Sequence, residues 1–458
     1  MKIRHLIFLL LFLFQAPITF GQQFSKAEVL SDLAYLRSSL EATHYDPFAY
    51  TSKSAFNRNY DAIRKSITKD SMNLLETISL FQQVISKANT GHAEIDFPAQ
   101  AYREYAMSGG TLFPLELAFE DEKVWIRKNF STDETLNVGT EVVSIDGQPI
   151  AQIIAKIHPQ LSAETTYFKN AKLELWSFPR LYWQVFGEQE LFSVGIKENG
   201  KLRKISLTAV ELIKDYEMKR EEVLSSKLNL RFYEAAAYLN PDNFSGDEKT
   251  YQSFIDSSFV EIRKSGIQRL VIDLRNNAGG HNSFSDYLIS YFADKPFKWY
   301  SSVTLKSSQL LKEQTRLQQD TTTAYAKTIL AHADGETFDY DFGTALPQQE
   351  SKRFKGEVYV LVNRHSYSMA AVSAALLQDY GFATVVGEKT SDFPTLHASQ
   401  FQYALPVTGI TIKVPKGYIV RPNGSKKKTG VTPDMFIRDH LVDEKDEILE
   451  GLFHQLKK

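Results

Sequence analysis

The chain has 458 residues, a length at which a soluble protein ordinarily divides into two or three domains. Its composition, 43% hydrophobic and 24% charged, is typical of a globular protein, and a formal net charge of −2 gives no electrostatic reason to expect nucleic acid as a partner. The sequence contains no cysteine, which excludes a thiol nucleophile, thiolate metal ligands and disulfide bonds.

The first segment, MKIRHLIFLLLFLFQAPITFG, has the pattern of a secretory signal. Lys2 and Arg4 precede an apolar run that ends at Phe14, and small residues follow. A charged start, a short apolar run and a small-residue exit are typical of a signal peptide, whereas a bilayer span requires a longer run. We therefore expect residues 1–21 to be removed, with no integral membrane span left, and the mature chain to be periplasmic or extracellular. An uncleaved N-terminal anchor is the alternative.

Residues 22–102 are expected to form a helical region that ends in a motif containing His92. The stretches SKAEVLSDLAYLRSSLEATH and SMNLLETISLFQQVISKA place apolar side chains at spacings of three and four, which predicts amphipathic helices. NTGHAEIDFP follows, and we expect it to be extended from Ala93 to Phe97.

Residues 103–210 are predicted to form a small β-rich domain. The runs TLFPLELAFEDEKVWIRKNF and ELFSVGIKENGKLRKISLTA have strand composition. Asn199-Gly200 is a strong signal for a hairpin turn between strands, and Asp146-Gly147 predicts a tight turn between a strand and a helix.

Residues 211–458 alternate between strand and helix patterns. The apolar runs LVIDL (270–274), VYVLVN (358–363) and ATVVGE (383–388) alternate with helical stretches. Continuous β-branched runs of this kind predict βαβ units and a parallel sheet buried on both faces. The polar stretch 300–355 is expected to be an insertion over one face of this core.

Two loops of this region follow predicted strands and lead into helices, at Arg275–His281 and Arg364–Ser368. Ligands of open α/β sheets bind beyond the carboxyl ends of the strands, and helix N-termini present free N–H groups there. The Ser368 hydroxyl would lie close to the N–H of Met369. Gly279 and Gly280 allow a second N–H to approach, so an oxyanion hole is conceivable. A serine in this position, like Ser366, can also be an ordinary helix cap.

A serine nucleophile needs a base, and three histidines are candidates. His92 lies between a glycine and a predicted strand, while His365 and His397 are near the serine or in a neighbouring loop. Each can equally be a structural residue. The chain has neither a metal-ligand spacing such as HExxH nor a phosphate-binding glycine loop, so we expect no metal or organic cofactor.

Five motifs, in this order, resemble those of the tail-specific, or C-terminal processing, serine peptidases. They are TGHAEIDFP, VGTEVVSIDGQPI, LVIDLRNNAGG, VYVLVNRHSYSMAAVSAALLQDYGFATVVGEKTSD and GVTPD. The resemblance extends from about residue 24 to 440. It implies an α/β fold in which a crotonase-like βαβ core (211–458) carries an N-terminal helical region and an inserted PDZ-like domain. It also implies Ser368 as nucleophile, with Met369 and Gly279–Gly280 as oxyanion donors.

The same resemblance implies which base is used. One branch of the family pairs the serine with a lysine at a fixed distance, where this chain has Phe393; Lys389 is near but out of register. The other branch, similar to the core of tricorn protease, uses the histidine of the GH motif, which His92 matches.

The third catalytic position is open. In that branch a glutamate precedes the GV.PD motif, but here GSKKKTGVTPD has lysines in its place. The candidates are Glu388, Asp392 and Glu94.

We therefore predict an exported serine peptidase that hydrolyses peptide bonds of a peptide or protein substrate. An acyl-enzyme would form on Ser368, with His92 as general base. The first alternative is a catalytically inactive peptide-binding protein on the same scaffold, and the second is a crotonase-like acyl-transfer enzyme.

Overall fold

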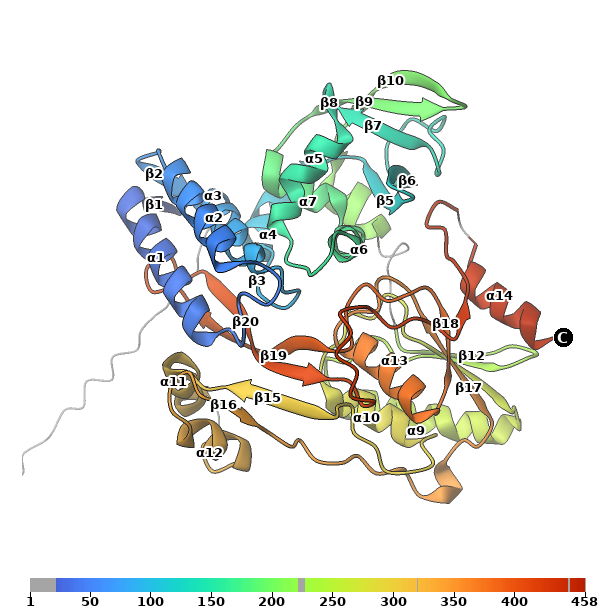
Figure 1. The fold of residues 1–458 in the computed structure, drawn as a ribbon. Helices are drawn as coiled ribbons and strands as arrows, with labels where there is room; N and C mark the ends of the chain where they lie inside the picture. Colours follow the sequence, from blue (N-terminus) through green and yellow to red (C-terminus); the bar gives the residue numbers. More distant parts are fainter. Residues whose placement is uncertain (1–21, 221–226, 319, 444, 458) are drawn as a thin grey trace, which may run out of the picture.

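The computed structural model of the chain describes residues 22–220, 227–318, 320–443 and 445–457 (Figure 1). The predicted signal peptide, residues 1–21, lies outside the described residues. The described part is a mixed α/β protein with several sheets. Within it, no helix combines the length and the apolarity that crossing a bilayer requires.

The N-terminal region is helical, as the apolar spacing predicts. Its elements are β1 (Gln23–Ser25), α1 (Lys26–Thr43), α2 (Lys53–Ser66), β2 (Ser71–Asn73), α3 (Leu74–Ile85), the 3-10 helix η1 (Ser86–Ala88) and β3 (Glu94–Ile95). Ser25 caps α1 and Asn73 caps α3, each within a capping box that satisfies two backbone N–H groups. These caps explain why the helices begin where they do.

The part of the chain from Ala99 to Glu217, called the middle domain below, contains a hydrophobic core of its own between Phe113 and Leu207. This part of the chain has α4 (Ala99–Met107), β4 (Thr111–Leu112), β5 (Leu115–Glu120), β6 (Lys123–Asn129), β7 (Glu141–Ile145), β8 (Gln148–Pro149), α5 (Ile150–Ile157), η2 (His158–Gln160), α6 (Thr166–Trp176), α7 (Phe178–Phe186), β9 (Leu191–Glu198), β10 (Lys201–Thr208), β11 (Val210–Glu211) and the π-helix η3 (Leu212–Glu217). The strands are ordered β10-β9-β7-β6-β5, and the turns predicted at Asp146-Gly147 and Asn199-Gly200 join neighbouring strands. Helices α6 and α7 were not expected from the sequence; Leu173 and Phe178 bury them against the sheet.

The rest of the chain builds a second unit around a largely parallel sheet. Its strands, in spatial order, are β12 (Asn229–Phe232), β13 (Ala237–Asn240), β14 (Arg269–Asp273), β17 (Glu357–Val362), β18 (Thr384–Gly387) and β21 (Met435–Phe436). All neighbours from β13 onward are parallel, which confirms the predicted βαβ pattern. Because β14 and β17 are adjacent and parallel, the loops that follow them lie side by side.

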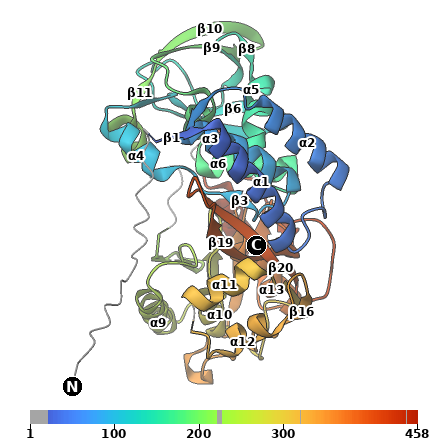
Figure 2. The same cartoon turned by 90° about the vertical axis from the view of Figure 1, so that its left-hand side faces the viewer.

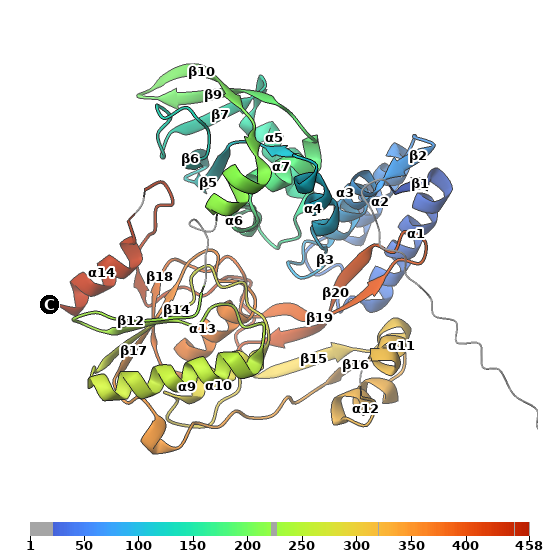
Figure 3. The ribbon, with the colours of Figure 1, turned by 180° about the vertical axis from the view of Figure 1, so that it is seen from behind.

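Helices cover both faces of this sheet. They are α9 (Glu248–Ser265), α10 (Asn282–Ser290), α13 (Met369–Tyr380) and α14 (Glu447–Leu456). Leu270 and Ile272 of β14 share a core with α9, α10 and α13, whereas the intervening Val271 shares a core with α14. This alternation follows from the two-residue period of a strand. Figure 3 shows α9 and α10 running alongside the sheet.

A further sheet connects the N-terminal helices to the core. It contains β15 (Ser302–Lys306), β16 (Thr337–Asp339), β19 (Leu396–Ala404) and β20 (Thr411–Val420), and β3 pairs with β20. The stretch 300–355 therefore contributes two strands to a sheet, in addition to α11 (Gln309–Gln318), α12 (Ala324–Ala331) and η4 (Glu350–Lys352). Figure 2 shows β19 and β20 between the N-terminal helices and α11 and α12.

Candidate active site

Ser368 lies at the junction of strand β17 and helix α13, where the sequence predicts it. Its backbone has φ 54° and ψ −122°, a region that a residue with a side chain rarely adopts. Ser368 is the residue before the helix, yet its side chain makes no capping hydrogen bond. The reading of this serine as an ordinary helix cap therefore does not fit, and its hydroxyl is available for another partner.

That partner is His92, whose Nε2 lies 3.2 Å from Ser368 Oγ. His92 is buried in a tight turn in which the Ala93 N–H bonds the Thr90 carbonyl, just before β3. Its ring stacks on Tyr367 with centroids 5.0 Å apart, and its carbonyl accepts a hydrogen bond from Gln400. Tyr367 of the nucleophile loop thus packs on the ring, while Gln400 of β19 holds the His92 backbone.

The environment keeps the His92 imidazole neutral. Burial, followed by the positive charge of Lys172, lowers the pKa of His92 to about 3. The Lys172 Nζ donates to the carbonyl of Gly91 at 2.6 Å, directly beside His92. A neutral imidazole with Nε2 facing a hydroxyl is the form that can accept the hydroxyl proton.

Gly279 and Gly280 lie beside the serine, but only one of them presents a free N–H group. The Gly279 N–H donates to Asn277 Oδ1 at 2.7 Å, so this amide is already engaged. Among the described residues, no protein acceptor takes the N–H groups of Gly280 or Met369. Both of these residues line the cleft that contains Ser368. The two free donors are therefore Gly280 and Met369, whereas Gly279, the third predicted donor, has its N–H engaged.

Gly279 instead leaves space for Ser368 and Met369, because it has no side chain. Its φ is +82°, and a Cβ at this position would lie 2.6 Å from Ser368 Cβ and 2.7 Å from the Met369 nitrogen. Such distances are far below van der Waals contact, so only glycine fits here.

A cleft of about 590 Å³ opens in front of Ser368. Trp299, Tyr325 and Phe342 form an aromatic wall, in which the Tyr325 and Phe342 rings lie 5.8 Å apart. Other apolar lining residues are Met369, Val372, Leu396, Ala398 and Ile419. Because Tyr325 and Phe342 belong to the stretch 300–355, this stretch forms part of the cleft wall.

Asp392 lies next to the pair. Its Oδ2 accepts the Ser368 N–H at 2.7 Å and is 3.9 Å from His92 Nε2, and its Oδ1 accepts the Phe393 N–H. Burial, followed by the negative charge of Glu164, raises the pKa of Asp392 to about 8. Asp392 therefore lies on the Nε2 side of the ring, not on the Nδ1 side where the acid of a catalytic triad is found.

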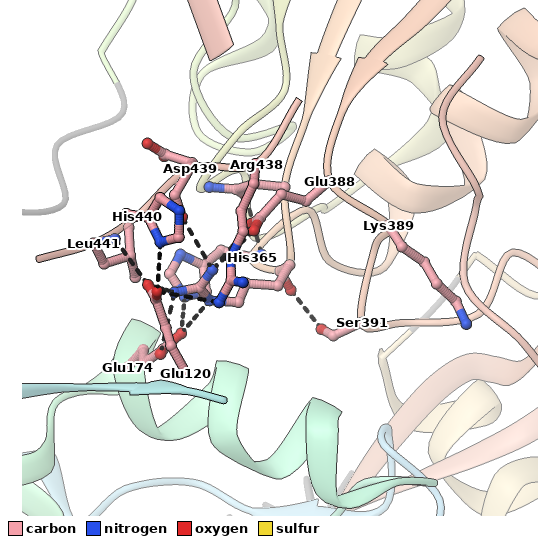
Figure 4. Close-up of polar contacts among 12 residues, drawn as sticks. Glu120, Glu174, His365, Glu388, Lys389, Ser391, Arg438, Asp439, His440 and Leu441 are labelled. Carbon is pink, nitrogen blue, oxygen red and sulfur yellow. Dashed lines mark hydrogen bonds and ion pairs between the residues drawn. The ribbon is translucent and has the colours of Figure 1, made fainter. Parts of the chain in front are cut away.

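The structure does not bring the other candidate acids to the His92 ring. Both oxygens of Glu388 lie 3.1 Å from Nη1 of Arg364, in the polar cluster of Figure 4. Glu94 Oε2 lies 3.3 Å from Lys172 Nζ.

The two competing histidines also have other partners. His365 lies between Glu174 and Asn276; Figure 4 shows its ring beside Glu174. The His397 ring packs against aromatic rings, with centroids 5.0 Å from Tyr418 and 5.7 Å from Tyr50. Neither histidine has a contact with Ser368 among the described residues.

Two residues near the site were missed by the sequence analysis. Glu164 Oε1 accepts the Gly91 N–H at 2.9 Å, and its Oε2 is buried without a partner among the described residues. His92 Nδ1 is likewise buried without one, so a free acceptor and a free donor flank Gly91. Lys416 on β20 is buried at the cleft wall, and its Nζ donates to the Ser399 carbonyl at 2.8 Å. No local sequence pattern indicates either residue, because both belong to segments that are far in the sequence from His92 and from Ser368.

Among the described residues, no cluster of three potential ligands could hold a metal ion. The chemical arrangement is instead a hydroxyl, a neutral imidazole and two free N–H groups around one cleft. That arrangement can perform nucleophilic attack on a carbonyl group.

Residues 235–437 match Peptidase family S41. Among solved structures, mature CPAF is 14% identical, with 94% of this chain and 96% of that chain covered and a TM-score of 0.63. The structure of mature CPAF complexed with lactacystin is also 14% identical, covers 94% of this chain and 97% of that one, and has a TM-score of 0.62. The photosystem II D1 C-terminal processing protease is 16% identical, with 94% and 98% covered and a TM-score of 0.47. At such identities the likeness to CPAF concerns the fold alone.

Proposed function

Since the chain is a serine-type peptidase of family S41, matched over residues 235–437, we propose that it cleaves peptide bonds through an acyl-enzyme on Ser368. His92 is the general base of this proposal. The observation that carries it is the distance of 3.2 Å between His92 Nε2 and Ser368 Oγ. A neutral imidazole at that distance is within reach of the hydroxyl proton.

The steps follow from the positions of the groups. His92 Nε2 accepts the proton as Ser368 Oγ bonds to the carbonyl carbon, and the negative oxygen is stabilised by the N–H groups of Gly280 and Met369. The imidazolium then gives its proton to the amine that leaves, which leaves an ester on Ser368. A water molecule, deprotonated by His92, attacks this ester and restores the serine.

The imidazolium needs a negative charge nearby because it forms in a buried place. Asp392 Oδ2, 3.9 Å from His92 Nε2, is placed to provide one when the carboxyl is ionised. Its bond to the Ser368 N–H also holds the strained serine in position. We therefore favour Asp392 over Glu388 as the supporting acid.

The wider proposal concerns architecture and location. The parallel sheet with its covering helices suits a crotonase-like core, and the middle domain, with its own core and tight hairpins, suits a PDZ-like domain that helps to hold a peptide or protein substrate. The N-terminal segment supports export to the periplasm or the cell exterior.

One observation favours a second candidate, a peptide-binding protein without hydrolytic activity. His92 Nδ1 has no hydrogen-bond partner among the described residues, whereas an active serine–histidine pair ordinarily has an acid on that nitrogen. Such a protein would use the same cleft to hold a peptide.

Labelling with a fluorophosphonate probe separates the two candidates. We expect wild-type protein to be labelled at Ser368, and labelling to disappear in Ser368→Ala and to fall steeply in His92→Ala. His454→Ala, which removes an exposed imidazole on α14, should be labelled like wild type. A well-folded wild type that resists the probe would favour the binding protein.

A further inference from the structure

Arg364, four positions before the nucleophile, is the centre of a buried polar cluster. Figure 4 shows Glu120, Glu174 and Glu388 of this cluster. Its guanidinium lies 3.0 Å from Glu120, 2.8 Å from Glu174 and 3.1 Å from Glu388. Glu120 ends β5 and Glu174 is on α6, so both belong to the middle domain, whereas Glu388 follows β18 of the peptidase core. Ion pairs therefore connect the nucleophile loop, residues 364–368, to the middle domain.

His365 extends this connection to a second loop. Its Nε2 lies 2.7 Å from Glu174 Oε2, and its Nδ1 lies 2.8 Å from Asn276 Oδ1. The ring is completely buried, so it has no water to replace either contact. Burial raises the pKa of Glu174, but the charge of Arg364 and the hydrogen bond from His365 together lower it to about 2. Glu174 is therefore a carboxylate that fixes the His365 ring.

Asn276 belongs to the loop that supplies the oxyanion donor. This loop leaves β14, and Asn276 has a left-handed φ of +58°. The next residue, Asn277, accepts the Tyr367 N–H with its carbonyl and the Gly279 N–H with its side chain. A shift of Asn276 would therefore move the segment that places Gly280 relative to Ser368.

We propose that Glu174 and His365 are positioning residues, through which helix α6 of the middle domain sets the geometry of the oxyanion hole by way of Asn276. The inference rests on the proposed function, because it concerns the donors of that same site. It follows that the peptidase site is complete only when the middle domain is docked on the core. Movement of α6 would break the Glu174–His365 contact and release both loops together.

The rival explanation is a structural clamp, that is, ion pairs that only hold the middle domain on the core. A variant of Glu120 distinguishes this explanation from the proposal. Glu120 comes from the same domain and pairs with the same guanidinium, yet it has no contact with His365. Loss of the Glu120 charge weakens the clamp but leaves the Glu174–His365–Asn276 connection intact.

The test uses the full chain and three variants. Asn276→Gly removes the amide without straining the backbone, because glycine accepts φ +58°. Glu174→Gln removes the charge that fixes the ring, and Glu120→Gln is the control. The measurements are the rate of fluorophosphonate labelling of Ser368, kcat and KM for one fluorogenic peptide with phenylalanine before the scissile bond, and inhibition by the corresponding peptide aldehyde.

We expect Asn276→Gly and Glu174→Gln to lower kcat about 10–100-fold with KM within about twofold of wild type, since a misplaced oxyanion donor acts on the transition state. Affinity for the aldehyde, which forms a tetrahedral adduct, should fall by a similar factor. Folded Glu120→Gln protein should keep kcat within about twofold of wild type, because the Glu174–His365 contact that positions the donor is unchanged.

Two outcomes would overturn the inference. One is an Asn276→Gly protein that folds and keeps the kcat and labelling rate of wild type; the other is an equal loss of kcat in Glu120→Gln. If Glu174→Gln does not fold because Arg364 loses a buried partner, Asn276→Gly still decides the matter. Wild-type protein that cannot be labelled would refute the proposed function instead, so the two failures are distinguishable.

Discussion

His92 Nε2 lies 3.2 Å from Ser368 Oγ, although 276 positions separate the two residues in the sequence. Strand β3, which begins two residues after His92, pairs with β20, and Tyr367, directly before Ser368, stacks on the imidazole. The distance between the two side chains therefore depends on how the N-terminal helices, the sheet that contains β20 and the loop Arg364–Ser368 pack against one another.

Substitution Gly279→Ala should abolish activity. The added methyl group would lie 2.6 Å from Ser368 Cβ, so the serine or the loop must shift. A displacement of about 1 Å at a reacting atom costs on the order of 100-fold in rate. We expect kcat/KM and fluorophosphonate labelling to fall at least that far.

Gly147→Ala is the matched control for that substitution. Gly147 also has a positive φ, of +75°, but a Cβ there meets nothing within 4 Å. It should cost only the backbone strain, about 1–2 kcal/mol, and leave labelling intact. Equal labelling of the Gly279→Ala and wild-type proteins would show that the glycine is not required for space.

The strain at Ser368 should be measurable as stability. With φ 54° and ψ −122°, the serine occupies a region that favours glycine. Ser368→Gly should therefore raise the free energy of unfolding by about 1–3 kcal/mol relative to Ser368→Ala, in urea denaturation, while both variants are inactive. Identical unfolding midpoints for the two variants would mean that the strain is not stored there.

Activity should rise with pH through the ionisation of Asp392. Its pKa is raised to about 8, by burial and then by Glu164, whereas His92 stays neutral with a pKa of about 3. If the Asp392 carboxylate supports the imidazolium, kcat/KM should increase with a midpoint near pH 8. Glu164→Gln removes a neighbouring negative charge and should move this midpoint to lower pH.

Glu388→Gln is the control for this shift, because Glu388 pairs with Arg364 and does not act on Asp392.

The free energy of unfolding should also depend on the protonation of Asp392. Between pH about 3.8 and about 8 the folded protein binds a proton at Asp392 that the unfolded chain has lost, so the free energy of unfolding falls as pH rises through this window. A kcat/KM profile that is flat from pH 6 to 9 would contradict the assigned part of Asp392.

The cleft should favour substrates with a large apolar side chain next to the scissile bond. Trp299, Tyr325 and Phe342 wall it, and burial of one such side chain contributes roughly 1.5–3 kcal/mol. Phe342→Ala should lower kcat/KM about tenfold for a peptide with phenylalanine in that position, and far less for one with alanine. Cleavage of a mixed peptide library, read by mass spectrometry, gives the preference directly.

Leu346→Ala controls for general loss of apolar surface in the same stretch. Leu346 is 68% exposed and does not line the cleft, so the preference should be unchanged. A library in which acidic or basic residues dominate at the cleavage site would refute the assignment of the aromatic wall.

Local patterns predicted the elements of the core. The runs LVIDL and VYVLVN appear as β14 and β17, and the small-residue stretch after Ser368 appears as α13, because continuous apolar runs and helical spacing leave few other structures. Helices α6 and α7 escaped prediction, since their apolar residues are matched to a sheet that the local sequence does not describe. Glu164, the acid beside Gly91, was not predicted for a similar reason. Gly91 belongs to the recognised motif, whereas Glu164 belongs to a distant segment of the chain.

The sequence by itself determined where a nucleophile could lie: a serine between a buried strand and a helix, with glycines on the neighbouring loop. It could do so because strand, helix and turn patterns depend on residues that are close together in the chain. The residues left three histidines open as the base, and the family resemblance indicated His92; only the tertiary structure decided which glycine amide stays free and which acids lie near the imidazole. Those choices depend on contacts between segments far apart in the chain, and they are settled by burial and pairing of charges when the sheets and domains pack.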